Sequence, residues 1–164
     1  MLIINVRSNS TILKDILKLE KMSNIKLNSF EKILLINTGT TEQMLQILSN
    51  SLTKVLILQQ TEKNDIITRK INIISNNRKK ILVSASSIIY VKNLPDKIID
   101  EIRKGEKGIG MILLENKLET YKRIIEIGYN SSDSIIYRKY VLLSKNHIVS
   151  KIVENFSIGI CRSN

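Results

Sequence analysis

The stretch "IITRKINII", residues 66–74, alternates in the manner of a β-strand but carries a charged side chain on its apolar face. Successive side chains of a strand point to opposite faces, so Arg69 lies between Ile67 and Ile71 on the more apolar one. An isolated charge in an apolar interior costs several kcal/mol. The question that this strand raises is therefore what Arg69 meets inside the fold.

Residues 66–74 are one of six stretches with strand character. The other five are 52–60, 80–91, 118–128, 134–143 and 147–157. Short polar breaks separate most neighbours, which is typical of antiparallel strands joined by tight turns.

Helical patterns precede these strands. Residues 10–22 carry an apolar stripe at helical spacing, formed by Ile12, Leu13, Ile16, Leu17 and Leu19. Asn28 and Glu31 have the spacing of a capping box, which predicts the start of a second helix. Gly39 and Thr40 mark a turn before a third helix.

A further helix is predicted over residues 94–104, with Asn93 as its N-cap and Gly105 closing it. The segment "GEKGIGMILL", residues 105–114, then holds three of the six glycines and is either a lid or a plain connection. Together the elements predict an α+β fold in a single domain over residues 1–164. Its core is a six-stranded antiparallel sheet with helices on one side.

The composition excludes several classes of protein. No apolar run approaches the roughly 18 residues that span a bilayer, and the first residues lack the basic start of a signal peptide. The single cysteine, Cys161, cannot form an internal disulfide and fits a reducing compartment, so we expect a cytoplasmic protein. With only one histidine, His147, no metal site is expected.

The chain is strongly basic, with 26 Lys and Arg against 15 Asp and Glu and a net charge of +11. Such a surface can attract nucleic acid, anionic lipid or an anionic metabolite. The lysines are scattered, however, and aromatic residues that stack on bases make up only 4%. An AT-rich genome explains the abundance of Ile, Lys and Asn, so we expect no nucleic-acid partner.

Two more charged residues fall on apolar strand faces. Glu154 shares a face with Ile152 in the last strand, and Arg123 shares one with Ile125 in the fourth. Arg69 and Glu154 either line a small apolar pocket that grips an anion or form a structural ion pair with each other. Because a one-residue bulge reverses the parity of a strand, the pattern leaves both interpretations open.

Four stretches, in their order and spacing, resemble the chorismate pyruvate-lyase family, especially its cyanobacterial, plastid-encoded and archaeal branch. They are "ILLINTGTTEQMLQIL" (33–48), "ITRKINII" (67–74), "KGEKGIGMILLENKLETYKR" (104–123) and "IYRKYVLLSKNHIVSKIVENFS" (136–157). The resemblance implies a chorismate lyase-like fold with an enclosed pocket. It also implies conversion of chorismate to 4-hydroxybenzoate and pyruvate for quinone synthesis, with no cofactor, and a plastid stroma if the gene is organellar.

The resemblance further implies the residues of the site. Arg69 would hold the ring carboxylate of the substrate, and Glu154 would meet the ring hydroxyl and act as general base, aided by apolar neighbours that raise its pKa. Backbone contacts would come from near Thr40 and Ile109. The turn at Gly39 and the glycine-rich segment would close over the ligand.

Two positions depart from the family pattern. Ser86 stands where the enterobacterial enzyme has a second arginine, and Lys117 stands where the cyanobacterial type has an arginine. Lysine does not reproduce the bidentate binding of a carboxylate by arginine. Lys117 and Arg123 are therefore the candidates for binding the second carboxylate of chorismate.

A sensor without catalytic activity is the alternative function. The same sheet architecture resembles the effector-binding domain of certain bacterial transcription regulators, and such a module would bind an aromatic carboxylate. Residues 1–27 are too short for the winged helix that these regulators carry, which favours the enzyme.

Overall fold

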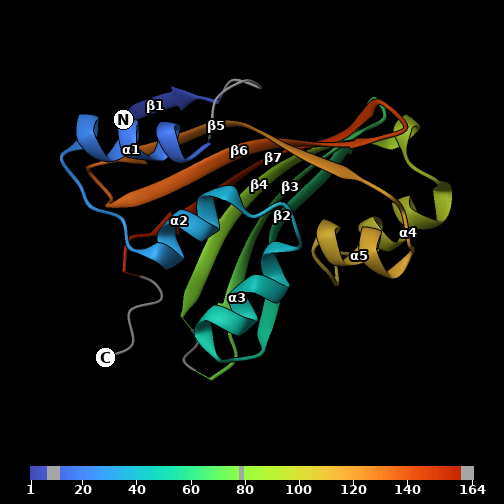
Figure 1. Ribbon diagram of the computed structural model, residues 1–164. Coiled ribbons are helices and arrows are strands. Elements are labelled where there is room, and N and C mark those ends of the chain that lie inside the picture. The colour runs from blue at the N-terminus through green and yellow to red at the C-terminus, as the bar shows by residue number, and fades with distance from the viewer. Residues whose placement is uncertain (7–11, 78–79, 160–164) are drawn as a thin grey trace.

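Seven β-strands form one antiparallel sheet in the computed structural model, which describes residues 1–6, 12–77 and 80–159 (Figure 1). The strands are β1 (Leu2–Asn5), β2 (Thr53–Lys63), β3 (Ile66–Ser75), β4 (Ile81–Tyr90), β5 (Tyr121–Asn130), β6 (Ile135–Ser144) and β7 (His147–Ser157). Their order across the sheet is β1-β5-β6-β7-β4-β3-β2, and each neighbouring pair is antiparallel. The predicted antiparallel sheet is confirmed.

The predicted number of six strands is wrong, because the sheet has seven. The additional strand is β1, which pairs with β5 at one edge and places Leu2 opposite Tyr129. Of its four residues only Ile4 is buried. A strand this short shows no recognisable alternation, so the pairing with β5 rather than the local pattern defines it.

The other six strands lie where the sequence predicted them, with shifts at their ends. The main differences are in β2, which extends to Lys63, and in β5, which begins at Tyr121. The residues before β5 fold back on the preceding helix instead, since the backbone N–H of Leu118 donates to the oxygen of Leu113.

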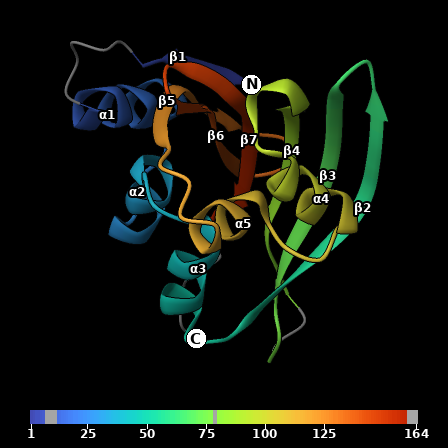
Figure 2. The same ribbon diagram turned by 90° about the vertical axis from the view of Figure 1, so that its right-hand side faces the viewer.

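The helices gather on one face of the sheet. They are α1 (Ile12–Ser23), α2 (Ser29–Ile36), α3 (Thr41–Ser49), the short 3₁₀ helix η1 (Val91–Asn93), α4 (Asp96–Lys104) and α5 (Ile109–Glu115). Helices α2 and α3 lie in front of the sheet in Figure 1, and in the view of Figure 2 α1, α2 and α3 lie together to the left of the strands. None of the helices in the described residues is long and apolar enough to cross a membrane.

Local sequence explains where α2 begins and where α4 ends. The Asn28 side chain accepts a hydrogen bond from the Glu31 N–H at 2.9 Å, and the Glu31 carboxylate accepts one from the Asn28 N–H at 2.8 Å. The capping box of α2 is thus confirmed. Gly105 closes α4 in the left-handed conformation, with a φ of 70°. The N-cap of α4 is Pro95 rather than Asn93, because residues 91–93 form η1.

Two helical predictions need correction. In α1 only Ile16 and Leu19 are buried, while Leu13 and Leu17 are about half exposed, at 51% and 49%. The buried stripe of this helix is therefore narrower than predicted. The glycine-rich segment contains the start of α5, which the sequence analysis did not predict because glycine is a poor helix former.

The apolar core fills the space between the helices and the inner face of the sheet. Fully buried members include Leu34 and Leu35 of α2, Leu45 of α3, Ile67 of β3 and Ile102 of α4. These side chains hold α2, α3 and α4 against the sheet. The space next to the first turns of α3 and α5 is not filled by this core.

Candidate functional site

A cavity of about 380 Å³ lies between the inner face of the sheet and the first turns of α3 and α5. Much of its lining is apolar and includes Ile71, Ile73, Leu113, Leu118, Leu142 and Ile152. Three strands of the sheet each contribute one ionisable side chain that can carry a charge at neutral pH: Arg69 from β3, Lys122 from β5 and Glu154 from β7. At the α3 side the cavity is lined by Glu42, which accepts a hydrogen bond from Thr53 at 3.4 Å.

Arg69 is buried in the cavity lining, with 3% of its surface exposed. Its Nε donates to Oε1 of Gln60 at 2.7 Å, and its terminal nitrogens donate to the backbone oxygens of Ile102 and Lys107, the latter at 2.9 Å. The guanidinium therefore ties β3 to the end of α4 and to the connection that leads to α5. Burial lowers the pKa of Arg69.

No carboxylate neutralises the charge of Arg69, since none of the ion pairs among the described residues includes it. A guanidinium has five N–H donors, and the three hydrogen bonds described above leave donors free for a ligand. The predicted alternative of an ion pair between Arg69 and Glu154 is wrong.

Lys122 reaches the cavity because of a β-bulge. The pairing between β5 and β6 shifts register between Ile124 and Glu126, so the inward face changes from even to odd positions along β5. Lys122 and Ile124 are buried before the bulge and Ile127 is buried after it. Arg123, which strict alternation would place inward with Ile127, is exposed.

The Lys122 ammonium also lacks a carboxylate partner among the described residues. Its Nζ donates to the backbone oxygen of Gly39 at 2.6 Å and lies 4.5 Å from the centre of the Tyr140 ring. Burial, and then the positive charge of Arg138, lower the pKa of Lys122 to about 8, although Glu154 acts in the opposite direction. The cavity thus contains two buried cations with no acidic partner.

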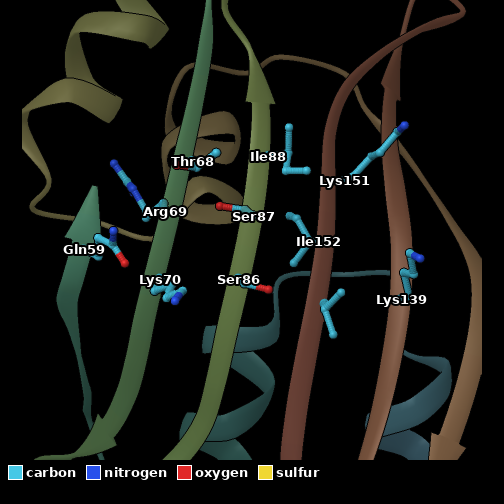
Figure 3. A pocket seen from close by; sticks show the side chains of 11 residues that line it. Gln59, Thr68, Arg69, Lys70, Ser86, Ser87, Ile88, Lys139, Lys151 and Ile152 are labelled. Carbon is cyan, nitrogen blue, oxygen red and sulfur yellow. The ribbon is translucent and has the colours of Figure 1, made fainter. Parts of the chain in front are cut away.

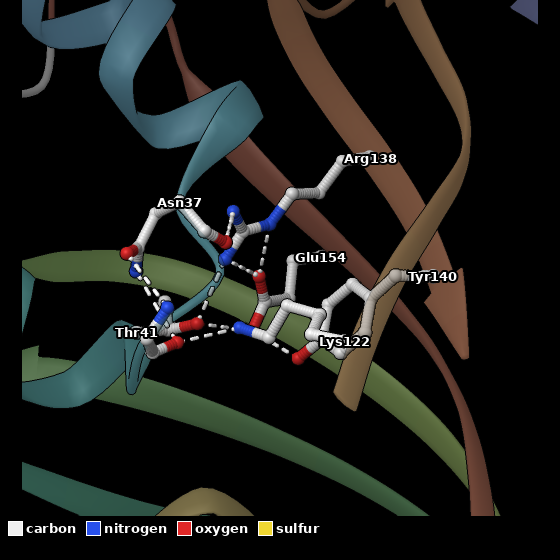
Figure 4. A network of polar contacts seen from close by, with 7 residues as sticks. Asn37, Thr41, Lys122, Arg138, Tyr140 and Glu154 are labelled. Atoms are coloured by element: carbon white, nitrogen blue, oxygen red, sulfur yellow. Dashed lines mark hydrogen bonds and ion pairs between the residues drawn. The ribbon is translucent and has the colours of Figure 1, made fainter. Parts of the chain in front are cut away.

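Glu154 is held at the centre of a polar network (Figure 4). Nε and a terminal nitrogen of Arg138 each lie 2.7 Å from its Oε2. The hydroxyls of Thr41 and Tyr140 donate to its Oε1 at 2.7 and 2.9 Å. Arg138 also donates to the backbone oxygen of Asn37 at 2.7 Å, which joins β6 to the end of α2. An ionised carboxylate offers about four acceptor positions, and three hydrogen bonds and the second Arg138 contact surround this one.

This network keeps Glu154 ionised. Burial by itself would raise the pKa of Glu154, but the charges of Arg138 and Lys122 and the hydrogen bond from Thr41 outweigh it and lower the pKa. The expectation of a raised pKa for this carboxyl group is therefore wrong. Burial and the charge of Glu154 raise the pKa of Tyr140 well above its usual value, so its hydroxyl remains a donor.

The cavity brings together Arg69, Glu154, Thr40 and Ile109 from the residues expected at the site. Thr40 is the N-cap of α3 and Ile109 is the first residue of α5. Lys117 and Arg123 do not line the cavity. Lys117 is exposed in the turn after α5, where its φ is 53°.

Sequence reasoning missed Arg138 and Lys122. Arg138 has the same parity as Ile136 and Tyr140 in β6, and this inward charge could have been found in the way that Glu154 was. Lys122 could not, because the bulge in β5 has no clear signal in the sequence. Ser86, at the place of the missing second arginine, is exposed on the helix-free face.

No cluster of three or more His, Cys, Asp or Glu side chains that could hold a metal ion occurs in residues 1–6, 12–77 and 80–159. His147 is exposed at the start of β7. Cys161 lies outside the described residues.

Removal of Arg138 alone should destabilise the fold strongly. In Arg138→Met the Glu154 carboxylate stays buried without its cation, and we expect a loss of about 3–5 kcal/mol in the free energy of unfolding. The double variant Arg138→Met/Glu154→Leu should recover most of that loss, because it also removes the carboxylate that Arg138→Met leaves without its cation. Urea denaturation of the three proteins measures both effects. Equal stability of the wild type and Arg138→Met would contradict this description of the network.

No family model and no curated protein matches this chain. Among solved structures it is similar to PhnF from Mycobacterium smegmatis, with a TM-score of 0.53 and 5% identity over 74% of this chain and 65% of that one. It is also similar to the possible transcriptional regulator YydK from Bacillus subtilis, with a TM-score of 0.42 and 12% identity over 92% of this chain and 79% of that one. The chain thus spans about 65% of the length of the PhnF chain.

At 5% identity the likeness to PhnF concerns the fold alone. It agrees with an α+β architecture of the chorismate lyase-like type.

Proposed function

We propose that the inner cavity binds a small aromatic molecule that carries one or two carboxylates. The observation that supports this most directly is the presence of Arg69 and Lys122, two buried cations without an acidic partner, in the lining of one cavity. Burying an unpaired charge is costly, and a ligand anion removes that cost. The cavity volume of about 380 Å³ is in the range of small-molecule sites.

The two cations differ in what they offer to a ligand. Arg69 has spare donors in a planar arrangement, which suits the two oxygens of one carboxylate. Lys122 is a point charge on the other side of the cavity, close to Gly39, and takes the role of second-carboxylate partner that the sequence analysis gave to Lys117 and Arg123. The apolar lining between them accepts the faces of a ring.

The sensor and the enzyme share this binding site, and the binding function is the one that the geometry supports best. Glu154 already accepts three hydrogen bonds and is paired with Arg138, which leaves it little capacity for a ligand hydroxyl. Its lowered pKa also makes it a weak base. The similar regulator-type fold is consistent with a binding module.

Chorismate pyruvate-lyase is the second candidate, since Glu154 lies in the same cavity as the two cations. In this reaction the ring carbon that bears the hydroxyl loses a proton and the C–O bond to the enolpyruvyl group breaks. The ring becomes 4-hydroxybenzoate, and enolpyruvate takes up a proton to give pyruvate, so no redox change requires a cofactor. Arg69 and Lys122 would hold the two carboxylates of the substrate, and Glu154 would meet the ring hydroxyl. The product would serve as a quinone precursor.

The purified protein should bind 4-hydroxybenzoate in isothermal titration calorimetry. Arg69→Lys should weaken the binding at least tenfold, about 1.4 kcal/mol, because lysine keeps the charge but not the planar set of donors. Arg123→Lys is the matched control, since it makes the same change at an exposed position outside the cavity. Unchanged affinity in Arg69→Lys would contradict the assignment of the carboxylate to Arg69.

Affinity for chorismate should fall as the pH rises from 7 to 9. Lys122 loses its positive charge with a pKa of about 8, while both carboxylates of the ligand stay ionised over this range. The attraction is therefore present below pH 8 and lost above it. Lys122→Met should bind chorismate weakly and show no such step. A wild-type affinity that does not change with pH would remove Lys122 from the site.

Incubation with chorismate separates the enzyme from the sensor. If the chain is a lyase, 4-hydroxybenzoate accumulates, Arg69→Ala raises KM and Glu154→Gln lowers kcat. Chromatography of the products over time measures all three effects. Binding of chorismate without any product would eliminate the lyase and leave the binding function in place.

A further inference from the structure

The helix-free face of the sheet carries a hollow of about 420 Å³ (Figure 3). Its lining includes Thr68, Lys70, Ser86, Ile88, Lys139 and Lys151. The close-up looks onto this face of the strands, with the helices behind them. The hollow and the inner cavity are therefore on opposite sides of the sheet.

The register of the strands arranges three lysines around this hollow. Lys70 of β3 lies opposite Ser86, Ser86 lies opposite Val153, and Val153 lies opposite Lys139 of β6. These residues form one row across four strands, which are spaced about 4.8 Å apart. Lys151 lies two residues from Val153 along β7 and is thus a diagonal neighbour of Lys139, at about 7–8 Å. Three long side chains on this frame can reach one ligand with several charges.

The three lysines have no acidic partner in the part of the chain that the structure describes. None of the ion pairs includes them, and no carboxylate lines the hollow. Glu126 lies opposite Lys139 in β5, but its carboxylate accepts a hydrogen bond from the hydroxyl of Tyr137. Lys139 and Lys151 are diagonal neighbours whose like charges repel one another, and a multiply charged anion would relieve that repulsion and can extend along the row toward Lys70.

The other residues that line the hollow indicate which class of ligand it can bind. Ser86 supplies a hydroxyl between Lys70 and the centre of the hollow. Ile88 and Val153 supply apolar surface, and Ile88 is 40% exposed. Lysine binds phosphate as a point charge, and a single carboxylate would engage only part of this set of cations. A compact molecule with two or more phosphate groups matches both features.

We propose that the helix-free face carries a second anion site, formed by Lys70, Lys139 and Lys151, for a small molecule with two or more phosphate groups. The three lysines lie on the opposite face of the sheet from the inner cavity, although Arg69, Ser87 and Ile152 belong to the linings of both. These three lysines account for part of the net charge of +11, which the inner cavity does not explain.

Calorimetry with inorganic tripolyphosphate and with ATP tests this site in the full chain at low and at moderate salt. The variant Lys70→Gln/Lys139→Gln/Lys151→Gln should bind both probes at least tenfold more weakly than the wild type. The control Lys14→Gln/Lys21→Gln/Lys97→Gln removes the same charge from exposed positions on α1 and α4 and should stay within twofold of the wild type.

Three results would overturn the proposal. Absence of binding by the wild type would show that the hollow is only a solvated basic face. An equal loss in the two triple variants would show that net charge alone attracts the probes. Tighter binding of a single-stranded oligonucleotide than of tripolyphosphate, lost in the first variant only, would assign the face to nucleic acid instead of a small molecule.

Discussion

The buried ion pair between Arg138 and Glu154 is the interaction on which the arrangement of the cavity depends. It joins β6 to β7 and, through Asn37 and Thr41, fixes both sides of the turn between α2 and α3. Glu154 is paired with Arg138 and accepts hydrogen bonds from Thr41 and Tyr140, and it forms no ion pair with Arg69. The cations of the cavity therefore remain available to an anion from outside the protein.

The two cations of the cavity, Arg69 and Lys122, each donate to a different segment of backbone at its edge. Arg69 donates to backbone oxygens at the end of α4 and in the connection to α5, and Lys122 donates to the oxygen of Gly39 before α3. Backbone oxygens are neutral acceptors and are weaker partners for a cation than a carboxylate is. On the proposed function, a carboxylate bound by the spare donors of Arg69 or by Lys122 would lie next to these segments. The same residues would thus bind the ligand and contact the segments around it.

Short polar breaks between strand patterns predicted the antiparallel sheet, and the alternation of side chains predicted that Arg69 and Glu154 point inward. Alternation left a pocket and an ion pair both open, and the role of these residues in a site came from the family resemblance. Alternation works for Arg69 and Glu154 because β3 and β7 keep a regular alternation around these positions. It fails at β5, where the bulge near Ile125 turns Lys122 inward and Arg123 outward. It also fails for β1, whose four residues acquire strand structure only by pairing with β5. Alternation predicts which residues point inward but not which of them pair, so it could not show that Glu154 pairs with Arg138.

The two faces of the sheet carry cations in different settings, a buried apolar cavity with Arg69 and Lys122 on one side and lysines around a hollow on the other. The central claim concerns the inner face, and a crystal structure of the protein grown with 4-hydroxybenzoate tests it most directly. The account predicts the ring between the sheet and α5, with its carboxylate within hydrogen-bonding distance of the Arg69 guanidinium. A ligand bound elsewhere, with the cavity filled only by water and Arg69 still donating to the oxygens of Ile102 and Lys107, would contradict it.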